Sequence, residues 1–327
     1  MKTETLYDIA SKLSLGKVIT KPTRIYGGFL HFSYKLETDK GQYMIKCFGN
    51  VSETLIKSSL QKEKLEELFK HSKIPAIYPL SFNGQCLQTV GDEAFYVFPF
   101  VSARSLQASE MSLDELRKIA IITAKMHSID CKIVFDTIQK PLSIDWNNYL
   151  KLSYALGYKL QSELNKVIPM LKELTSEYNK AIGMMPRVLV LSHNDMDCKN
   201  VLWLNGNPML IDLECIGYNS PYYEAYKYAL VYAGYEEGNI DIEKVKFFMS
   251  TYFDNVSVNL NRNIDPKLLY YASGLNLEWL EFSLKRALKI VGNTADEQKI
   301  GVEQTQLCLK EISHFYQLKD ELISIKF

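Results

Sequence analysis

Residues 193–200 read His-Asn-Asp-Met-Asp-Cys-Lys-Asn, and residues 210–214 read Leu-Ile-Asp-Leu-Glu. The first stretch has the form H-x-D-x-x-x-x-N, and the second places an aspartate directly after a short hydrophobic run. Turn residues Asn205-Gly206-Asn207 lie between them and predict a hairpin of residues 200–205 and 208–213. Such a hairpin would bring the polar loop and the end of the second strand side by side.

The oxygen donors of these two stretches suit phosphoryl transfer. That reaction needs a carboxylate that orients an acceptor hydroxyl and takes its proton, and we predict Asp195 as this catalytic base. Mg²⁺ prefers oxygen ligands and is usually held by one or two carboxylates with phosphate and water, so Asn200 and Asp212 are the predicted metal ligands. His193 is expected to brace the loop. The alternative interpretation is a solvated turn, because Asn and Asp also crowd ordinary turns.

The first hundred residues carry strand patterns and one helix. Residues 31–48 predict a hairpin, because apolar and polar side chains alternate over residues 31–37 and a second extended run, residues 42–48, follows the turn Thr38-Asp39-Lys40-Gly41. Residues 55–70 have apolar side chains at helical spacing. Residues 77–82 and 94–100 are predicted strands. We therefore expect a small antiparallel sheet with one helix.

From about residue 102 the pattern becomes helical. Ser112-Leu113-Asp114-Glu115 has the form of a capping box, residues 145–182 predict a long helical segment, and residues 187–192 predict a short strand. The predicted fold is α+β and bilobal. An N-terminal nucleotide-binding lobe would comprise residues 1–101, and a larger, mainly helical lobe for catalysis and acceptor binding would comprise residues 102–327.

Lys46 ends an apolar strand and is the predicted phosphate-binding lysine. In kinases such a lysine pairs with the nucleotide phosphates and with a glutamate on the following helix. Glu63 is the preferred partner here, with Glu66 and Glu67 as competitors on the same helix. The Lys46 ammonium group is expected to face the Asp195 and Asp212 carboxylates. The alternative is that Lys46 is simply an exposed strand end.

Two further segments have the character of a nucleotide site. Gly27 and Gly28 would let backbone N–H groups approach a phosphate, although a plain turn is the alternative. Phe98, Phe100 and Val101 lie in the expected link between the lobes, where backbone groups could bond an adenine edge, and an ordinary edge strand is the alternative. The glycine turn, strand lysine, helix glutamate, link, polar loop and final aspartate occur in the order found in kinases.

The motifs resemble those of the aminoglycoside phosphotransferase and choline kinase family, over a region from Gly27 to about Ala229. Members have a loop like H-G-D-x-H-x-x-N, in which Asn194 and Asp197 here replace the usual glycine and second histidine. An I-D-W-E-like segment is similar to residues 211–214. The resemblance implies a protein-kinase-like fold, ATP or GTP as co-substrate, Mg²⁺ as cofactor and a small-molecule hydroxyl as acceptor.

The same resemblance assigns Asp195 as base, Asn200 and Asp212 to magnesium, and Lys46 with Glu63 to the phosphate side. A protein kinase is less consistent with the sequence. Asn194 stands where H-R-D has arginine, and neither D-F-G nor A-P-E is present.

The acceptor is expected to bind the helical lobe, which is rich in aromatic and acidic residues. Carboxylates would suit a polyamine-like sugar, whereas an aromatic cage would suit a quaternary amine through cation–π attraction. Both remain open, as does the interpretation that the aromatic residues only pack helices. The candidate acceptor-binding residues are Asp197, Glu214, Tyr218, Glu278, Trp279 and Glu281.

Composition excludes several other classes of protein. Lys plus Arg and Asp plus Glu are both 38, so no net charge favours nucleic acid as a partner. No apolar run approaches the roughly 20 residues that a membrane helix needs, and a cytoplasmic location is expected. The six cysteines form no Cys-x-x-Cys pair, which favours reduced thiols over zinc or disulfides.

Other functional hypotheses concern proteins without turnover. One is a catalytically silent structural or nucleotide-binding protein with the kinase fold, of the spore-coat type. Another is a helical interaction module. The retention of Lys46, Asp195, Asn200 and Asp212 together argues against the silent protein, whereas a helical module would show no Mg²⁺-dependent nucleotide binding in a thermal-shift assay. The acceptor, the choice of ATP or GTP and the oligomeric state stay open.

Overall fold

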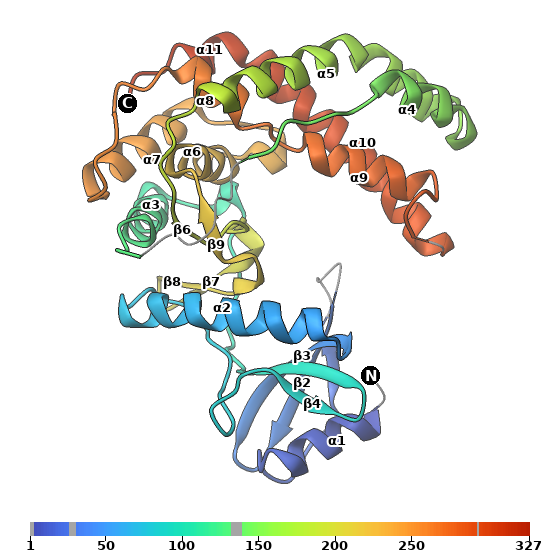
Figure 1. The fold of residues 1–327 in the computed structure, drawn as a ribbon, viewed down its shortest axis with the longest axis vertical. Helices are drawn as coiled ribbons and strands as arrows, with labels where there is room; N and C mark the ends of the chain where they lie inside the picture. The colour runs from blue at the N-terminus through green and yellow to red at the C-terminus, as the bar shows by residue number, and fades with distance from the viewer. Residues whose placement is uncertain (1–2, 26–30, 132–138, 293) are drawn as a thin grey trace. The chain divides into compact units, whose positions relative to one another are not determined.

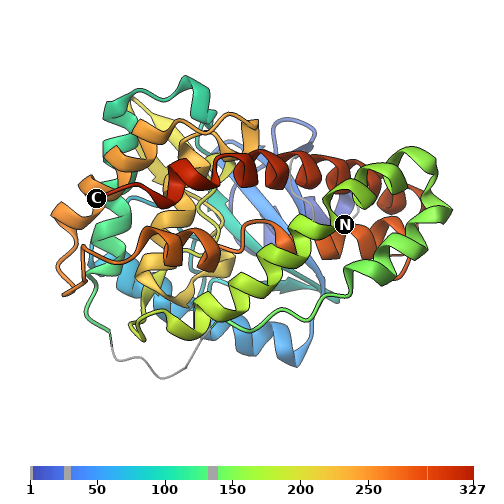
Figure 2. The same cartoon turned by 90° about the horizontal axis from the view of Figure 1, so that it is seen from above.

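The computed structural model describes residues 3–25, 31–131, 139–292 and 294–327 (Figures 1 and 2). The chain forms two compact units. Unit 1 comprises Met1–Ser105 with Asn200–Gly217, and unit 2 comprises Leu106–Lys199 with Tyr218–Phe327. The boundary expected at residue 101 follows chain order, whereas unit 1 also includes the later segment 200–217.

A five-stranded antiparallel sheet forms the centre of unit 1. The strands, in the order β1-β2-β3-β5-β4, are β1 (Thr23–Ile25), β2 (Phe32–Thr38), β3 (Gly41–Asn50), β5 (Glu93–Pro99) and β4 (Gln88–Val90). In the β2–β3 hairpin Thr38 pairs with Gly41, which confirms the hairpin predicted from alternation and the turn. β5 pairs with β3 along its length and confirms the strand predicted at residues 94–100.

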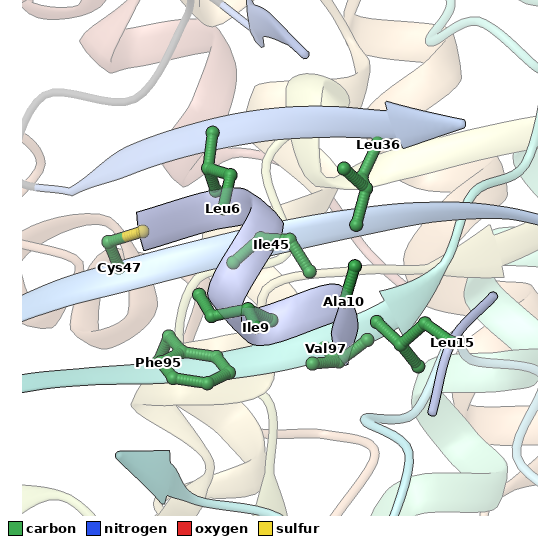
Figure 3. Close-up of a cluster of buried hydrophobic side chains, with 9 residues drawn as sticks. All are labelled: Leu6, Ile9, Ala10, Leu15, Leu36, Ile45, Cys47, Phe95 and Val97. Carbon is green, nitrogen blue, oxygen red and sulfur yellow. The ribbon is translucent and has the colours of Figure 1, made fainter. Parts of the chain in front are cut away.

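Helix α1 (Thr3–Lys12) lies against the sheet and was not predicted. Its buried side chains Leu6, Ile9 and Ala10 pack with Ile45 of β3 and with Val97 of β5 (Figure 3). Their spacing of three and four residues is the amphipathic signal that the polar appearance of the amino terminus concealed. The expectation of a sheet with a single helix is therefore wrong, because α1 covers part of the sheet.

The strand predicted at residues 77–82 is not present. Only Ala76 and Phe82 form isolated bridges in this region, and the edge strand of the sheet is β4 instead. Pro79 lacks a backbone N–H group and cannot take part fully in a ladder, which explains why an apolar run stays irregular. Its neighbours still bond to strands, because the Leu80 N–H donates to the Val97 carbonyl at 2.7 Å.

The remaining elements of unit 1 confirm the sequence patterns. Helix α2 (Glu53–His71) matches the helix predicted at residues 55–70, and its N-cap is Ser52, whose side chain accepts a hydrogen bond from Leu55 N–H. β7 (Val201–Leu204) and β8 (Asn207–Leu210) form the predicted hairpin. The short helix η4 (Leu213–Cys215) follows directly.

Unit 2 is mainly helical, as expected. Its helices include α3, whose N-cap Ser112 forms the predicted capping box with Glu115. The long segment predicted at residues 145–182 is interrupted at Gly157, where φ is 98°. Glycine adopts that conformation without a steric penalty, so two helices form in place of one. α9 (Leu277–Ala287) and α5 (Tyr158–Met184) both pack against α10 (Ala295–Gln317).

The elements of this unit are η1 (Ala108–Glu110), α3 (Leu113–His127), α4 (Trp146–Leu152), η2 (Ser153–Leu156), α5 (Tyr158–Met184), β6 (Val190–Ser192), η3 (Cys198–Asn200), β9 (Gly217–Asn219), α6 (Pro221–Tyr232), η5 (Tyr235–Glu237), α7 (Ile242–Asn255), α8 (Pro266–Ala272), α9 (Leu277–Ala287), α10 (Ala295–Gln317) and α11 (Lys319–Ile323). The last residue of η3, Asn200, and the first residue of β9, Gly217, belong to unit 1.

Two expectations about the whole chain can be compared with the described residues. None of the helices described there combines the length and apolar character needed to cross a bilayer. The six cysteines all lie in described segments and form no disulfide, and four of them are buried: Cys47, Cys86, Cys198 and Cys308.

Glu66 of α2 is a buried carboxyl group, only 5% exposed, and its Oε2 atom has no hydrogen-bond partner among the described residues. It lines a cavity of about 130 Å³ together with Lys62, Tyr96 and Glu214 of the same unit. Burial, reinforced by neighbouring glutamates and opposed by Lys70, raises the pKa of Glu66 from 4.5 to about 7.

Glu66→Gln is expected to raise the thermal midpoint Tm at pH 8 and to leave it nearly unchanged at pH 4.5. A carboxyl group whose pKa is raised on folding stabilises the fold fully below 4.5, and this contribution is lost as the pH rises through about 7. The rise in the pKa of Glu66 corresponds to about 3 kcal/mol of folding stability that the parent protein loses at high pH. The glutamine variant has no ionisable group at this position and does not undergo this loss. Thermal melts of both proteins between pH 4.5 and 8 measure this, and a difference that does not grow with pH would contradict it.

Candidate active site

Lys46 of β3 is held by two carboxylates of the segment 200–217. Its Nζ atom lies 2.8 Å from Asp212 Oδ1 and 2.6 Å from Glu214 Oε1, and its side chain is 12% exposed. These contacts confirm the expected meeting of Lys46 and Asp212. Glu214, predicted as an acceptor-binding residue, is the second ion-pair partner of Lys46.

The local backbone explains how both carboxylates reach Lys46. Asp212 has φ 61° and ψ 56°, a left-handed conformation that turns the chain between β8 and η4. Asp and Asn tolerate this region better than most residues, because their short polar side chains can bond locally. The turn sends the chain into η4, which carries Glu214.

Opposing effects act on the charge of Lys46. Burial disfavours the ammonium form, but the nearby Glu214 and Asp212 carboxylates outweigh it and raise the pKa of Lys46 above its ordinary value. His31 Nε2 also lies 3.5 Å from Glu214 Oε2. Lys46 is therefore a fixed positive charge in unit 1.

The predicted pairing of Lys46 with Glu63 is wrong. Glu63 Oε1 accepts a hydrogen bond from Leu87 N–H at 3.2 Å, while the ion pairs of Lys46 within the described ranges go to Asp212 and Glu214. α2 instead presents Ser59 to this part of the sheet, where its hydroxyl bonds the Tyr96 hydroxyl. Tyr96 is the cross-strand neighbour of Lys46.

The other predicted nucleotide-binding residues have mixed outcomes. Gly27 and Gly28 lie outside the described residues. Phe98 lies in β5 opposite Met44. The Phe100 N–H group donates to Gln42 O at 3.0 Å, and the Val101 carbonyl accepts from Ala103 N–H at 3.1 Å, so both backbone groups are already engaged within unit 1.

The predicted metal ligands Asn200 and Asp212 belong to the same unit. Asn200 is 5% exposed, and its backbone carbonyl accepts from Ile211 N–H at 2.9 Å, which ties the two segments together. No cluster of three His, Cys, Asp or Glu side chains suited to a metal occurs in the described part of the chain. This donor set fits Mg²⁺ better than zinc, because Mg²⁺ takes few protein ligands and completes its shell with phosphate and water.

The loop of residues 193–197 is fixed within unit 2. Asn194 has φ 67°, and its Oδ1 atom accepts from Asn219 Nδ2 at 2.8 Å. The Asp195 N–H group donates to His193 Nδ1 at 3.3 Å, so His193 braces the loop locally, as expected. Asparagine suits this position, because asparagine and glycine both accept the left-handed region.

The two aspartates of this loop differ electrostatically. Burial and the nearby Asp197 carboxylate raise the pKa of Asp195, and Lys199 and Lys227 only partly oppose them. Burial also disfavours ionised Asp197, but Lys227 and Lys199 outweigh it and hold its pKa below the ordinary value. Asp197 accepts a hydrogen bond from Lys199 Nζ at 3.1 Å. Asp197 is thus the permanent anion, and Asp195 is the carboxylate with raised proton affinity.

Sequence reasoning missed a buried network centred on Glu224 of α6, which is 1% exposed. Glu224 Oε1 accepts from Asn194 N–H at 2.7 Å, and Oε2 lies 2.6 Å from His127 Nε2. His127 Nδ1 lies 2.8 Å from the Tyr252 hydroxyl. The available signal was a single carboxylate in a helix that is aromatic and aliphatic apart from Lys227, because such a group must find partners when it is buried.

Two of the predicted acceptor residues of α9, Trp279 and Glu281, contact other helices of unit 2. Glu281 accepts from the Tyr149 hydroxyl at 2.9 Å and pairs with Lys285 at 3.0 Å, and Trp279 Nε1 donates to Gln304 at 3.3 Å. These contacts fix helices within unit 2. Glu278 is exposed, and Tyr218 of β9 is half-buried.

Comparison with known proteins matches residues 24–290 to the model of the choline/ethanolamine kinase family. The chain belongs to the choline/ethanolamine kinase family. It is 21% identical to human ethanolamine kinase 2 over 279 residues, which cover 84% of this chain and 61% of the human protein. The chain thus spans less than two thirds of the length of this curated relative.

Solved structures support the protein-kinase-like fold. A spectinomycin phosphotransferase in complex with ADP and spectinomycin superposes with a TM-score of 0.72 at 15% identity, covering 97% of this chain and 99% of the other. An ethanolamine kinase from Plasmodium vivax superposes with a TM-score of 0.59 at 15% identity, covering 94% of this chain and 89% of the other. Identities this low establish the fold alone.

Asn194→Ala is expected to be less stable than Asn194→Gly. Both variants lose the acceptor for Asn219, so their difference isolates the left-handed backbone at this family loop. Alanine pays the steric cost of positive φ, which exceeds the entropy that glycine gains in the unfolded chain by about 1 kcal/mol. Thermal melts should place the alanine variant roughly 2–4 °C lower. Equal midpoints would argue against a constraint at this position.

Proposed function

We propose that the protein is a small-molecule kinase that transfers the γ-phosphate of ATP or GTP to a hydroxyl group. The observation that carries the proposal is the double ion pair of Lys46 with Asp212 and Glu214, residues 166 and more positions away in the chain. Family membership over residues 24–290 supports it as well. Nucleotide binding is assigned to unit 1 and proton acceptance to the loop of residues 193–197.

The proposed step begins with the acceptor hydroxyl beside Asp195. Its proton moves to the Asp195 carboxylate while the oxygen forms a bond to the γ-phosphorus, and the bond from that phosphorus to the leaving diphosphate breaks. The raised pKa of Asp195 makes this carboxylate a better proton acceptor than an ordinary aspartate. Lys46 would neutralise phosphate charge. Mg²⁺ held by Asn200 and Asp212 would supply further neutralisation of the phosphate oxygens.

For the acceptor we propose an alcohol that also carries an amine. The similarity to human ethanolamine kinase 2 and the fold shared with a spectinomycin phosphotransferase support this class. The loop supports it too, because the Asp197 carboxylate is held ionised two residues after the proposed base and would favour a cationic acceptor. Of the acidic candidates on α9, Glu278 is the exposed one.

The direct test is release of ADP or GDP by the purified protein with Mg²⁺-ATP or Mg²⁺-GTP. Ethanolamine, choline, spectinomycin, other aminoglycosides and neutral sugars are offered as acceptors. Turnover that depends on an amine-bearing alcohol is expected. Tight Mg²⁺-nucleotide binding with no turnover on any acceptor would overturn the proposal in favour of a catalytically silent nucleotide-binding protein.

Asp195→Asn is expected to lower kcat by about 10²–10⁴-fold, because the amide cannot accept the proton. Nucleotide affinity, measured by titration calorimetry with a non-hydrolysable analogue, should stay within about threefold, or about 0.7 kcal/mol. In the parent protein the acid limb of kcat/KM should lie above the ordinary aspartate pKa, since the base must be ionised. An unchanged kcat in the variant would remove Asp195 as the base.

Glu214→Gln and Glu63→Gln form a matched pair that separates the observed lysine partner from the one expected from sequence. Glu214→Gln removes a charge 2.6 Å from Lys46, and we expect nucleotide kcat/KM to fall about tenfold, or about 1.4 kcal/mol. Glu63→Gln keeps an oxygen that can accept from Leu87 N–H and should change kcat/KM by less than about twofold. The reverse ranking would restore Glu63 as the functional partner.

A further inference from the structure

Three side chains of α6 form a ladder of hydrogen bonds to the loop that carries Asp195. Glu224, Tyr228 and Tyr232 are four residues apart and therefore share one face of the helix. The Tyr228 hydroxyl donates to Glu224 Oε1 at 2.5 Å and accepts from Met196 N–H at 3.3 Å. The Tyr232 hydroxyl donates to the Met196 carbonyl at 2.8 Å.

These bonds hold the backbone on both sides of Asp195. Glu224 bonds the N–H group of the residue before it, and the two tyrosines bond the N–H and C=O groups of the residue after it. Met196 is fully buried and lies outside any strand or helix. Buried backbone groups need partners, and in irregular backbone side chains must provide them.

The tyrosine hydroxyls are suited to this work because they stay protonated. Burial, together with neighbouring carboxylates, raises the pKa of Tyr228 and of Tyr232 well above the ordinary value. Each hydroxyl is therefore protonated, and able to donate, at neutral pH. Positional precision matters for a base, because a misplacement of about 1 Å can cost about 10²-fold in rate.

Another tyrosine of the same helix shows that packing alone does not require a hydroxyl. Tyr226 is also fully buried, but its hydroxyl has no hydrogen-bond partner among the described residues. Its ring contacts Phe327 edge-on, with centroids 6.4 Å apart. Tyr226 therefore serves as an internal comparison for the loss of a hydroxyl that bonds nothing.

We propose that Tyr228 and Tyr232 are positioning residues for the phosphoryl transfer, acting through the backbone of Met196 to fix the Asp195 carboxylate where it accepts the proton. This inference rests on the proposed function. It assigns to two aromatic residues of α6 a role in the rate of the chemical step and none in nucleotide or acceptor binding. Their hydroxyl groups, more than their rings, would carry that role.

The experiment compares Tyr228→Phe and Tyr232→Phe with the control Tyr226→Phe. We expect kcat to fall about 10–100-fold in each of the first two, with KM for nucleotide and acceptor within about threefold, and no change in the control. Loss of folded protein would also lower the apparent kcat without changing KM. The kcat of each variant is therefore divided by the folded fraction measured by circular dichroism, and the expected fall must remain after this correction. Wild-type kcat in both test variants would overturn the inference.

Amide hydrogen exchange provides a readout that does not depend on activity. Exchange in the peptide that spans residues 193–200 is expected to be at least tenfold faster in Tyr228→Phe than in Tyr226→Phe, because Met196 N–H loses its acceptor. Unchanged exchange would overturn the inference whatever the activity. If the parent protein has no kinase activity, the proposed function is overturned. Faster exchange in Tyr228→Phe would then still show that the Tyr228 hydroxyl holds the loop.

Should Tyr228→Phe not fold, Tyr232→Phe carries the kinetic test alone. It removes only the donor to the Met196 carbonyl and leaves the Glu224 contacts in place. A lowered kcat with unchanged KM in this variant supports the inference, and an unchanged kcat refutes it.

Discussion

The buried carboxylate of Glu224 is the constraint on which the arrangement of unit 2 depends. A charge removed from water is tolerated only when donors surround it, and here they come from His127 of α3, from Tyr228 of α6 and from the backbone of Asn194. The pKa of Glu224 stays below its ordinary value because His127 and Tyr228 outweigh the effect of burial, which acts in the opposite direction. Two helices and a loop are thus joined at one group, and the irregular loop can be buried because its polar atoms are satisfied.

Unit 1 contains a mostly buried cation, Lys46, which needs carboxylate partners in the same way. Lys46 projects from β3 in the middle of a sheet, and α2 contributes Ser59, which bonds its cross-strand neighbour Tyr96, in place of an acid. The partners come from a part of the chain more than 150 residues later, through the left-handed turn at Asp212. Two non-glycine residues with positive φ, Asn194 and Asp212, therefore lie in the two motifs that were most informative in the sequence.

The sequence predicted those features that depend on periodicity or on turn chemistry. The hairpins at residues 31–48 and 200–213, the helix at residues 55–70 and the capping box at Ser112 all follow from local rules and are present. The strand predicted at residues 77–82 is absent, because Pro79 disfavours a strand even in a run of apolar residues. The true role of this segment is to bridge to β8 and β5 through single backbone bonds.

Contacts between distant segments could not be predicted in the same way. The choice of Glu63 over Glu66 and Glu67 has no basis in periodicity, because charged residues occur along much of α2 and the pattern does not reveal which acid faces the sheet. The partner of Lys46 depends on where the β7–β8 hairpin docks, and no local pattern encodes that. The same limit applies to Glu224, whose importance depends on a histidine 97 residues away.

The discontinuity of unit 1 has a consequence for the order in which the chain matures on the ribosome. Residues 1–105 emerge first, but the Leu210 backbone that bonds Pro75 and Ile77, and the carboxylates that neutralise Lys46, arrive only with residues 200–217. At roughly 5–20 residues per second the intervening stretch takes on the order of 10 s to synthesise. During that interval Lys46 of the sheet lacks its carboxylate partners and the backbone of residues 75–77 lacks its partner Leu210, so nascent unit 1 is incomplete until much of unit 2 has also been made.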